Sequence, residues 1–163
     1  MFTIVGLIVA VAAALLLLVA VLHAGSSGMQ NSKASDAAAE LAQLELGVQG
    51  LYSAQASFNS LTNTVALDAG TSVVPSSMDD GNGGIVNEWG GTVTLSGNGS
   101  QFTITETEVP QSACAVLATK ATNPISVAVN GGGALSSPID VGTVAADCSS
   151  NGNNNTLTFT FGH

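Results

Sequence analysis

Residues 1–22 read MFTIVGLIVAVAAALLLLVAVL and contain one polar side chain, Thr3, and no charged residue. As a helix this run would be about 33 Å long, because each residue adds about 1.5 Å. The hydrocarbon core of a bilayer is about 30 Å thick, so the run is long enough to span it. Such a surface is strongly disfavoured in water. The sequence therefore predicts a helix that is buried in lipid or in other protein.

A cleaved secretory signal is one alternative for this run, and it would need a basic region ahead of the apolar one. No Lys or Arg precedes Lys33, and the apolar run begins at residue 1. The pattern therefore favours a retained segment over a cleaved signal. A simple membrane anchor stays open, as does a helix that begins in lipid and ends inside a polymer.

The charge balance restricts the partners of the chain. Eleven acidic residues face two basic ones, Lys33 and Lys120, which gives a formal net charge of -9. Nucleic-acid binding needs clustered Lys or Arg to neutralise phosphates, and two separated lysines do not supply this. We therefore expect no direct nucleic-acid binding. The roughly 135 residues after residue 28 suffice for one domain with a modest core.

The chain has two cysteines, Cys114 and Cys148. An even pair that follows an export-competent apolar segment predicts a structural disulfide. The bond would close a loop of about 35 residues, which is worth roughly 4 kcal/mol in the chain-entropy model. A metal or redox pair is the alternative, but there is no Cys-x-x-Cys spacing, and His23 and His163 lie near or at the two ends. We therefore predict no metal site and no cofactor.

A second helical section is expected over residues 34–57, which are rich in Ala, Leu, Glu and Gln. Asp36, Glu40, Gln43 and Gln49 fall largely off its apolar stripe. Gly25 and Gly28, with two serines between them, predict a bent or locally melted section between the two helical halves. The stripe that would pack on a sheet consists of Leu41, Leu44, Val48, Leu51 and Tyr52, with Gln55 at the same spacing.

Residues 58–91 read as a connection, with a short helix or strand near residues 61–67. The run Asp79, Asp80, Gly81, Asn82, Gly83, Gly84 is turn chemistry. A calcium loop is the functional alternative, because three of these side chains carry oxygen donors. The run lacks the spacing and the closing Glu of the helix-loop-helix calcium motif, so a plain turn is favoured.

The second half of the chain has the alternation of β-strands in residues 92–95, 101–105, 125–129 and 156–161. Residues 96–100 predict a hairpin turn. Two short helices are expected at residues 111–122 and 140–148. The fold class is therefore α+β, with a long N-terminal helix on an antiparallel sheet of about four strands and a disulfide-closed C-terminal region. We divide the chain into an apolar helix (1–24), a bent and then amphipathic helix (25–57) and a globular head (58–163).

Several short motifs, in this order, resemble a mature type IVb pilin, the subunit of a bacterial type IV pilus. They are GVQGLY at residues 47–52, NEWGG at 87–91, Val109-Pro110 through Leu117-Ala118-Thr119, and AADC at 145–148. The chain is similar to conjugative thin-pilus and bundle-forming pilins. The resemblance covers the whole chain, and it implies a major structural subunit that polymerises into an extracellular filament.

The resemblance also implies the partners and the route of the subunit. A precursor would sit in the inner membrane, where a prepilin peptidase removes a basic leader and the new N-terminus is methylated. Assembly machinery would then move the apolar helix into a fibre of identical subunits used in conjugation, adhesion or aggregation. The lack of a basic leader fits a processed chain whose first residue is Met1, and an initiator Met1 is the alternative. The residues expected in the filament core are Met1, Phe2, Thr3, Val5, Gly6, Leu7, Ala10, Leu15, Leu18 and Leu22.

One position departs from the family pattern, because pilins usually have Glu where this chain has Val5. We expect side-chain packing alone to set the register of neighbouring helices. Within the head, the resemblance implies that residues 114–148 contact neighbouring subunits. A minor pilin, a secretion pseudopilin and an anchored monomeric binding domain are the alternatives.

An enzyme is not expected. The only histidine after residue 28 is the terminal His163, so a nucleophile in the head would have no histidine base nearby. Glu106 and Glu108 could form a carboxylate pair, but we expect strand alternation to place both on one solvated face. We therefore predict no catalytic residues.

Overall fold

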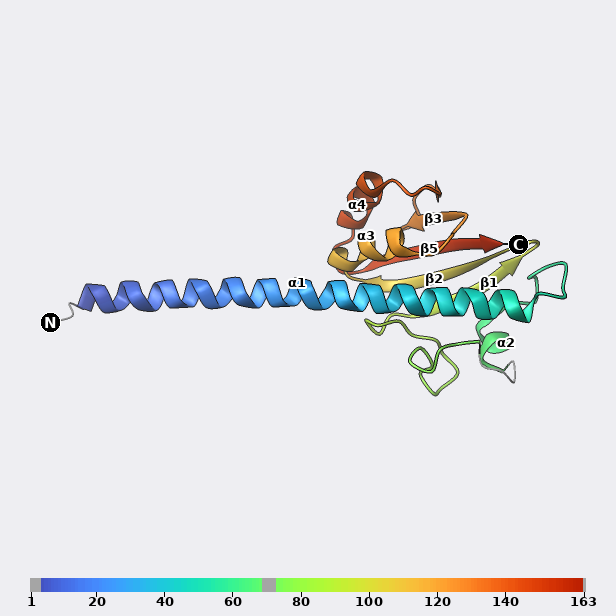
Figure 1. The fold of residues 1–163 in the computed structure, drawn as a ribbon, viewed down its shortest axis with the longest axis horizontal. Helices are drawn as coiled ribbons and strands as arrows, with labels where there is room; N and C mark the ends of the chain where they lie inside the picture. The colour runs from blue at the N-terminus through green and yellow to red at the C-terminus, as the bar shows by residue number, and fades with distance from the viewer. Residues whose placement is uncertain (1–3, 69–72, 163) are drawn as a thin grey trace.

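A computed structural model describes the backbone of residues 4–68 and 73–162, and the side chains of residues 28–68 and 73–162. Helix α1 (Ile4–Leu51) has 48 residues, which corresponds to roughly 70 Å, and its C-terminal half lies against a head made by the rest of the chain (Figure 1). The head contains α2 (Asn63–Asp68), α3 (Gln111–Lys120), α4 (Val141–Ser149), β1 (Val93–Asn98), β2 (Gln101–Val109), β3 (Ser126–Val129), β4 (Leu135–Ser136) and β5 (Asn155–Gly162).

The strands form one antiparallel sheet in the order β1-β2-β5-β3-β4. The C-terminal strand β5 therefore lies in the middle, between β2 and β3, and closes the head. The predicted α+β fold is confirmed, with a fifth strand added. That strand, β4, has two residues, and a segment so short has no alternation by which a sequence could reveal it.

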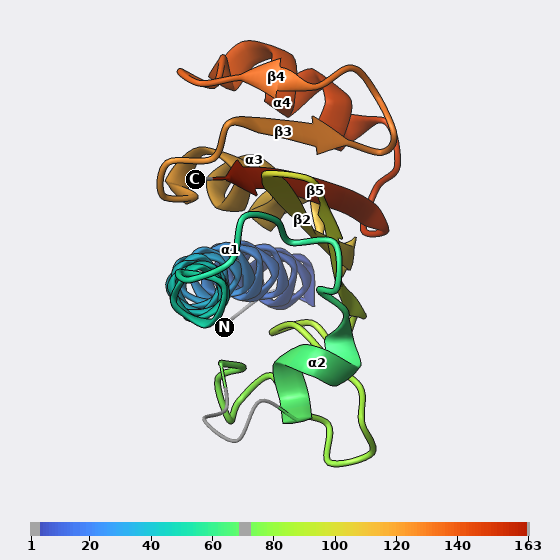
Figure 2. The ribbon, with the colours of Figure 1, turned by 90° about the vertical axis from the view of Figure 1, so that its right-hand side faces the viewer.

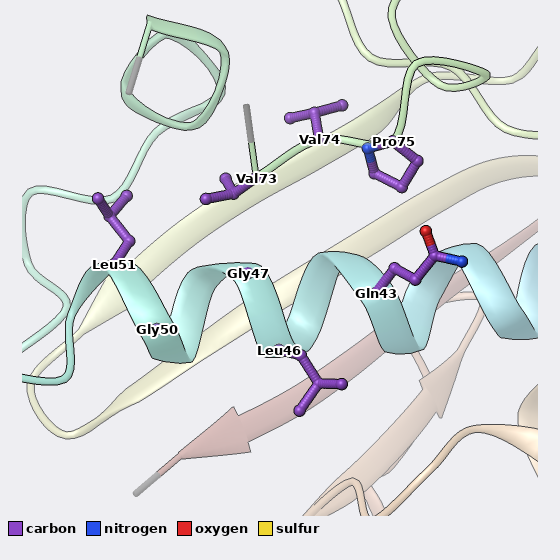
Figure 3. A pocket seen from close by; sticks show the side chains of 8 residues that line it. All are labelled: Gln43, Leu46, Gly47, Gly50, Leu51, Val73, Val74 and Pro75. Carbon is purple, nitrogen blue, oxygen red and sulfur yellow. The ribbon is translucent and has the colours of Figure 1, made fainter. Parts of the chain in front are cut away.

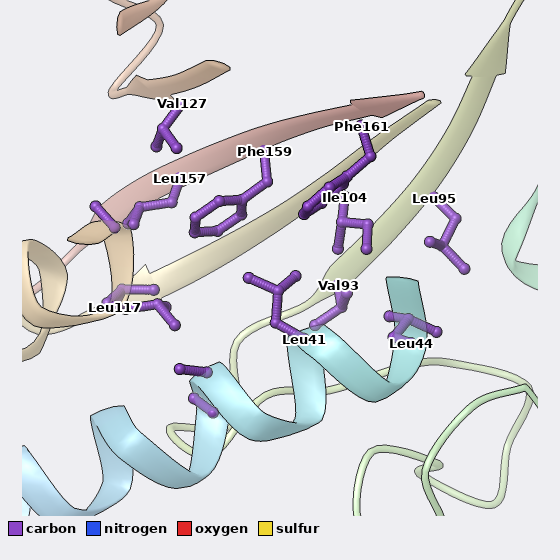
Figure 4. Close-up of a cluster of buried hydrophobic side chains, with 14 of the residues drawn as sticks. Leu41, Leu44, Val93, Leu95, Ile104, Leu117, Val127, Leu157, Phe159 and Phe161 are labelled. Atoms are coloured by element: carbon purple, nitrogen blue, oxygen red, sulfur yellow. The ribbon is translucent and has the colours of Figure 1, made fainter. Parts of the chain in front are cut away.

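The hydrophobic core lies between the C-terminal half of α1 and one face of this sheet (Figure 4). Leu41, Leu44 and Val48 of α1 are each at most 1% exposed. They face the strands' inward side chains, in which Phe102 pairs with Phe161 and Ile104 with Phe159 across β2 and β5. The outward positions of the same strands carry hydroxyls, such as Thr105 and Thr158, whose oxygens lie 3.1 Å apart.

Four of the five residues in the predicted apolar stripe are buried, and Leu51 is partly buried. The helix ends earlier than predicted, at Leu51 rather than at residue 57, so Gln55 lies beyond it and is exposed. Turn-type hydrogen bonds from Ser53 to Gly50 and from Gln55 to Tyr52 replace the helical pattern there. The turn lets the chain reach Phe58, which packs on Phe102 with ring centroids 4.8 Å apart.

The prediction of a locally melted section around Gly25 and Gly28 is wrong, because α1 passes through both residues without interruption. The helix ladder supplies hydrogen bonds to this backbone in any surroundings, and two glycines cost only about 1 kcal/mol each relative to Ala. A bend of the intact helix at these residues stays a prediction.

The placement of Glu106 also corrects the sequence analysis. Glu106 was expected on a solvated face with Glu108, yet it is 1% exposed and faces inward with Phe102 and Ile104. Inward and outward side chains alternate along β2, and this places Glu106 on the same face as Phe102 and Ile104. The register of β2 against β5 shifts between Glu106 and Val109, and Glu108 has a φ of 57°. This bulge separates the two carboxylates, and Glu108 stays exposed.

Contacts that involve both lysines tie α1 to the head near the point where it leaves the sheet. The Lys33 amine donates to the backbone carbonyl of Glu88 at 3.0 Å, and the Lys120 amine donates to the Ser35 hydroxyl at 2.7 Å. The indole N–H of Trp89 donates to the Gln30 side chain at 2.9 Å. These bonds fix the direction in which the N-terminal half of α1 leaves the head.

Within the part of the chain whose side chains are described, no helical stretch has the length and apolar character needed to cross a membrane. The apolar run of residues 1–22 lies outside that part, so its role in a membrane or a filament core stays a prediction.

The predicted disulfide is present, and Cys114 of α3 and Cys148 of α4 are joined with Cα atoms 5.9 Å apart. Both cysteines are buried, and the bond holds the two short helices together. We expect Cys114→Ser to lower the free energy of unfolding by about 2–5 kcal/mol, because a closed loop constrains the unfolded chain.

Denaturant unfolding under oxidising conditions measures this loss. The Cys114→Ser/Cys148→Ser double variant is the control, because it lacks the free Cys148 thiol that the single variant keeps. Its free energy of unfolding should be close to that of the single variant if the free thiol has no effect of its own. A single variant that unfolds at the same denaturant concentration as the parent chain would contradict the structural role of the bond.

Candidate functional site

An open groove of about 620 Å³ runs along the end of α1 that lies over the head (Figure 3). One wall is the surface of α1 and the other is the extended segment 73–75. None of its lining residues is charged, in a chain whose net charge is -9. The lining consists of Gln43, Leu46, Gly47, Gly50, Leu51, Val73, Val74 and Pro75.

Leu46 is among the lining residues and is 66% exposed, and its side chain points away from segment 73–75 (Figure 3). It belongs to an exposed stripe of α1 that also contains Ala39, Gln43 and Gly50 at helical spacing. The opposite stripe is the one buried on the sheet. The groove thus offers an uncharged surface of mixed apolar and polar character that the head itself leaves uncovered.

Gly47 allows segment 73–75 to pack directly against α1. A Cβ atom at this position would lie 2.8 Å from the Cβ of Val73 and 2.9 Å from its carbonyl oxygen. Gly50, one turn further along, would meet nothing within 4 Å. The sequence suggested only that both glycines weaken the helix, because the approach of Val73 comes from a segment far along the chain.

Hydrogen bonds hold segment 73–91 across α1 and the sheet edge. The hydroxyl of Ser77 donates to the carboxylate of Glu40 on α1. The Met78 amide donates to the Pro75 carbonyl at 2.9 Å, and the Val86 amide donates to the Met78 carbonyl at 2.8 Å. The wall of the groove is therefore anchored by these hydrogen bonds at Ser77 and Met78 and by Val74, which is 3% exposed and belongs to the core.

The predicted turn at residues 79–84 is confirmed. The Asp80 carboxylate accepts hydrogen bonds from the amides of Asn82 at 2.7 Å and Gly84 at 2.9 Å. These bonds hold the pKa of Asp80 below its ordinary value, because they favour the charged carboxylate. The carboxylate is engaged by its own loop, as a structural turn requires.

The carboxyl groups of Glu106 on β2 and Glu40 on α1 have raised pKa values. Burial raises the pKa of Glu106 to about 8, a hydrogen bond from Asn87 opposes the rise, and the charge of Glu40 adds to it. One oxygen of Glu106, Oε2, has no hydrogen-bond partner. Burial is also the main cause that raises the pKa of Glu40, with the charges of Glu88 and Asp36 contributing.

The disulfide-linked helices occupy the opposite flank of the head. In Figures 1 and 2, α2 and segment 73–91 lie on one side of α1, and α4 and β4 lie on the other. A hollow between α3 and α4, lined by Gln111, Ala115 and Ala145 among others, sits beside Cys148. Val141, at the start of α4, is 59% exposed. The two flanks differ, so contacts between them would be head-to-tail.

The residues predicted for the filament core fall into two groups, according to how much of each the structure describes. Met1, Phe2 and Thr3 lie outside the described residues. Val5, Gly6, Leu7, Ala10, Leu15, Leu18 and Leu22 lie in α1, and only their backbone is described. Their packing role stays a prediction.

A long projecting N-terminal helix, packed by its C-terminal half on an antiparallel sheet with a disulfide-closed C-terminal region, defines a type IV pilin. A crystal structure of TcpA, a type IV pilin from Vibrio cholerae El Tor biotype, has the same fold at 12% identity with a TM-score of 0.55. The match covers 80% of this chain and 99% of the TcpA chain. A comparison with curated protein sequences returns no match.

The family described as PilS N terminal matches residues 31–162, and the chain belongs to this family. The resemblance to type IVb pilins that the motifs indicated is thereby confirmed. Pilins are structural subunits of pili, and their fold and family are not those of enzymes.

The two groove glycines provide a matched pair of substitutions. We expect Gly47→Ala to lower the free energy of unfolding by about 1–3 kcal/mol, because the new Cβ would press on Val73. Gly50→Ala should raise it by up to about 1 kcal/mol, because Ala favours helix and meets open space. Thermal unfolding of the full chain in detergent measures both changes, and equal effects of the two substitutions would contradict the close approach at Gly47.

The raised pKa of Glu106 predicts how stability depends on pH. Below about pH 4.5 the carboxyl is neutral in both states, and above that pH only the unfolded chain ionises until the native pKa near 8 is reached. Stability should therefore fall between these limits as pH rises, and Glu106→Gln should remove this fall. The variant should be about 3 kcal/mol more stable at pH 7 and nearly unchanged at pH 4.

Denaturant unfolding at several pH values tests this expectation. Glu108→Gln is the control, because Glu108 is exposed on the same strand. If Glu106→Gln loses stability at pH 7 and pH 8, the native carboxyl is charged there and the assignment is wrong.

Proposed function

We propose that this pilin is the major subunit of a type IVb-like pilus and polymerises through the N-terminal half of α1. The observation that carries the proposal is the direction of α1. Its N-terminal half projects away from the head, and no other described element runs alongside it (Figure 1). Its sequence is apolar over residues 1–22, so identical helices or lipid must cover it.

Lipid tails are about as apolar as packed Leu and Val side chains, so moving the helix from bilayer to fibre can be nearly neutral in free energy. Close packing then favours the fibre, and small residues such as Gly6 and Ala10 allow neighbouring helices to approach. We propose an inner-membrane precursor, processed by a prepilin peptidase and methylated, as the starting state. Assembly machinery would extract the subunit from the membrane.

The heads would contact each other on the fibre surface through their two unlike flanks. The uncharged groove beside Leu46 fits an apolar side chain of a neighbour, and Val141 on the opposite flank is such a side chain. Contact between unlike surfaces repeats without closing when the rotation between subunits allows it, and this produces a helical filament. The filament would serve cell–cell contact, such as conjugation, adhesion or aggregation.

Electron microscopy of shed surface fibres, with N-terminal sequencing of their main component, tests the proposal. A major pilin should be the dominant protein of the fibre. Fibres in which this chain is a trace component would indicate a minor pilin. Surface fibres absent from cells with intact assembly machinery would favour a pseudopilin or an anchored monomer.

A substitution in the groove tests the contact between heads. We expect Leu46→Glu to abolish fibres or reduce them at least about tenfold, because it places a charge in an apolar contact between acidic subunits. The head should stay folded, since exposed substitutions change stability by only about 0.5 kcal/mol. Quantitative immunoblotting of sheared fibres measures the yield.

Ile125→Glu is the matched control, because Ile125 is also exposed, at 44%, and lies outside the groove. Normal fibre yield from Leu46→Glu would exclude the groove as a contact. An equal loss in both variants would show that added charge, rather than its position in the groove, limits assembly.

A further inference from the structure

Four asparagines of the chain are followed directly by glycine, namely Asn82, Asn98, Asn130 and Asn151. In such a pair the backbone nitrogen of the glycine can attack the side-chain carbonyl carbon of the asparagine, because glycine has no Cβ atom to hinder the approach. The attack needs a glycine amide that is not held in a hydrogen bond and an asparagine side chain that can turn toward it. All four pairs have the same local sequence, so the tertiary structure decides which of them can react.

The pair at Asn98 is blocked at its nucleophile. The amide of Gly99 donates to the side-chain oxygen of Asn59 at 2.6 Å. The carbonyl of Gly99 accepts a hydrogen bond from the Phe58 amide at 2.8 Å, so this glycine is held on both sides. The nitrogen that would attack Asn98 is therefore engaged in the folded chain.

The pairs at Asn130 and Asn151 are blocked at the asparagine. The oxygen of the Asn130 side chain accepts from the Thr156 amide at 2.9 Å, and its nitrogen donates to the Asn155 side chain at 2.9 Å. The Asn151 side-chain nitrogen donates to the Asn154 carbonyl at 2.8 Å, and the Asn151 carbonyl accepts from the Asn154 amide at 3.2 Å. Neither side chain can turn toward its glycine without losing these bonds.

The pair at Asn82 is the exception. Asn82 and Gly83 are exposed, and within the described part of the chain neither the Gly83 amide nor the Asn82 side-chain oxygen has a hydrogen-bond partner. The Asn82 side chain is held through its nitrogen alone, which donates to the Asp80 carbonyl at 3.2 Å. The Asp80 carboxylate binds the amides of Asn82 and Gly84, on either side, and leaves the Gly83 amide between them open.

We propose that Asn82 is a site of spontaneous deamidation in the folded protein, with water as the co-reactant. The Gly83 nitrogen forms a bond to the side-chain carbonyl carbon of Asn82, the Gly83 amide proton passes to water, and the side-chain nitrogen leaves as ammonia. The resulting succinimide ring takes up water, which breaks one of its two C–N bonds. The product at position 82 is aspartate or isoaspartate, so the net reaction exchanges an amide and water for a carboxylate and ammonium.

The modification changes the turn that contains it. It adds a carboxylate beside Asp79 and Asp80 in a chain whose net charge is already -9. In the isoaspartate product the main chain gains one carbon atom between residues 82 and 83. One oxygen of Asp80 accepts from the amides on both sides of this insertion, at 2.7 and 2.9 Å, so the longer chain strains at least one of these bonds. The bridge between Asp79 and Ile85 closes the same turn and should loosen with it.

Peptide mapping by mass spectrometry tests the proposal on the full-length chain in detergent, after incubation at mildly alkaline pH and digestion in acid. In the folded chain Asn82 should convert about tenfold faster than each of the other three sites, because those react only when local opening breaks their hydrogen bonds. In the chain unfolded by denaturant, the four sites should convert at similar rates, since all are Asn-Gly pairs.

Two variants test the cause of the difference. Asn82→Gln should abolish conversion at this position, because the longer side chain would have to close a less favourable six-membered ring. Asn59→Ala removes the acceptor of the Gly99 amide. Conversion at Asn98 should then rise several-fold toward its rate in the unfolded chain, while conversion at Asn82 stays unchanged.

The proposal is overturned if Asn82 converts no faster than the other three sites in the folded chain, or converts only in denaturant. An unchanged rate at Asn98 in Asn59→Ala would also overturn it, because the hydrogen bond of the glycine would then not control the reaction. The conversion should also be visible in the turn itself. Hydrogen exchange of residues 79–86 should be faster in the converted chain than in Asn82→Gln kept under the same conditions, while residues 94–104 of the sheet exchange alike.

These measurements are independent of fibre formation, because they use the unassembled chain. Absence of fibres would count against the proposed function and would leave the conversion rates unaffected. Equal rates at the four sites would count against deamidation at Asn82 and would leave the proposed function unaffected.

Discussion

The contact between α1 and the inner face of the sheet is the interaction on which the rest of the molecule depends. Leu41, Leu44 and Val48 are almost fully buried there, and each contributes about 1.5–3 kcal/mol relative to exposure. Without α1 the inner sides of β2 and β5 would expose their phenylalanines. Without the sheet the helix would have two apolar surfaces in water. One helix thus builds the core of the head and also carries the segment that must be covered by lipid or by other subunits.

The distribution of charge is consistent with a subunit that must approach copies of itself. Subunits of net charge -9 repel each other, and contacts between them are most favourable where carboxylates are absent. The groove is uncharged, and the outward side of the sheet carries mainly Thr and Ser. The two lysines take part in contacts that fix the exit of α1 from the head. The hydrogen bonds of the lysines therefore help to orient the helix, and the groove that we propose as a contact between subunits carries no charge.

The buried carboxyl groups lower stability at neutral pH, and an apolar residue at position 106 would fill the space without this cost. Glu45 on α1 is a second example, because it is 7% exposed and burial raises its pKa. The head consequently gains stability as pH falls toward 5. The core of the head would therefore be most stable in weak acid.

The sequence by itself determined the long N-terminal helix, the disulfide, the four longer strands and the α+β class. Each of these depends on local composition or on a period of two or 3.6 residues, and both are visible along the chain. Tertiary structure alone decided that β5 lies between β2 and β3 and that β4 exists. It also decided that Val73 packs directly against Gly47 and that the Glu106 carboxyl is buried beside Asn87, where the charge of Glu40 acts on it. Apart from the pairing of β4 with the nearby β3 and the nearness of Asn87 to Glu106, these features join segments 26 to 66 residues apart, whose proximity is set by how the core packs and leaves no local pattern.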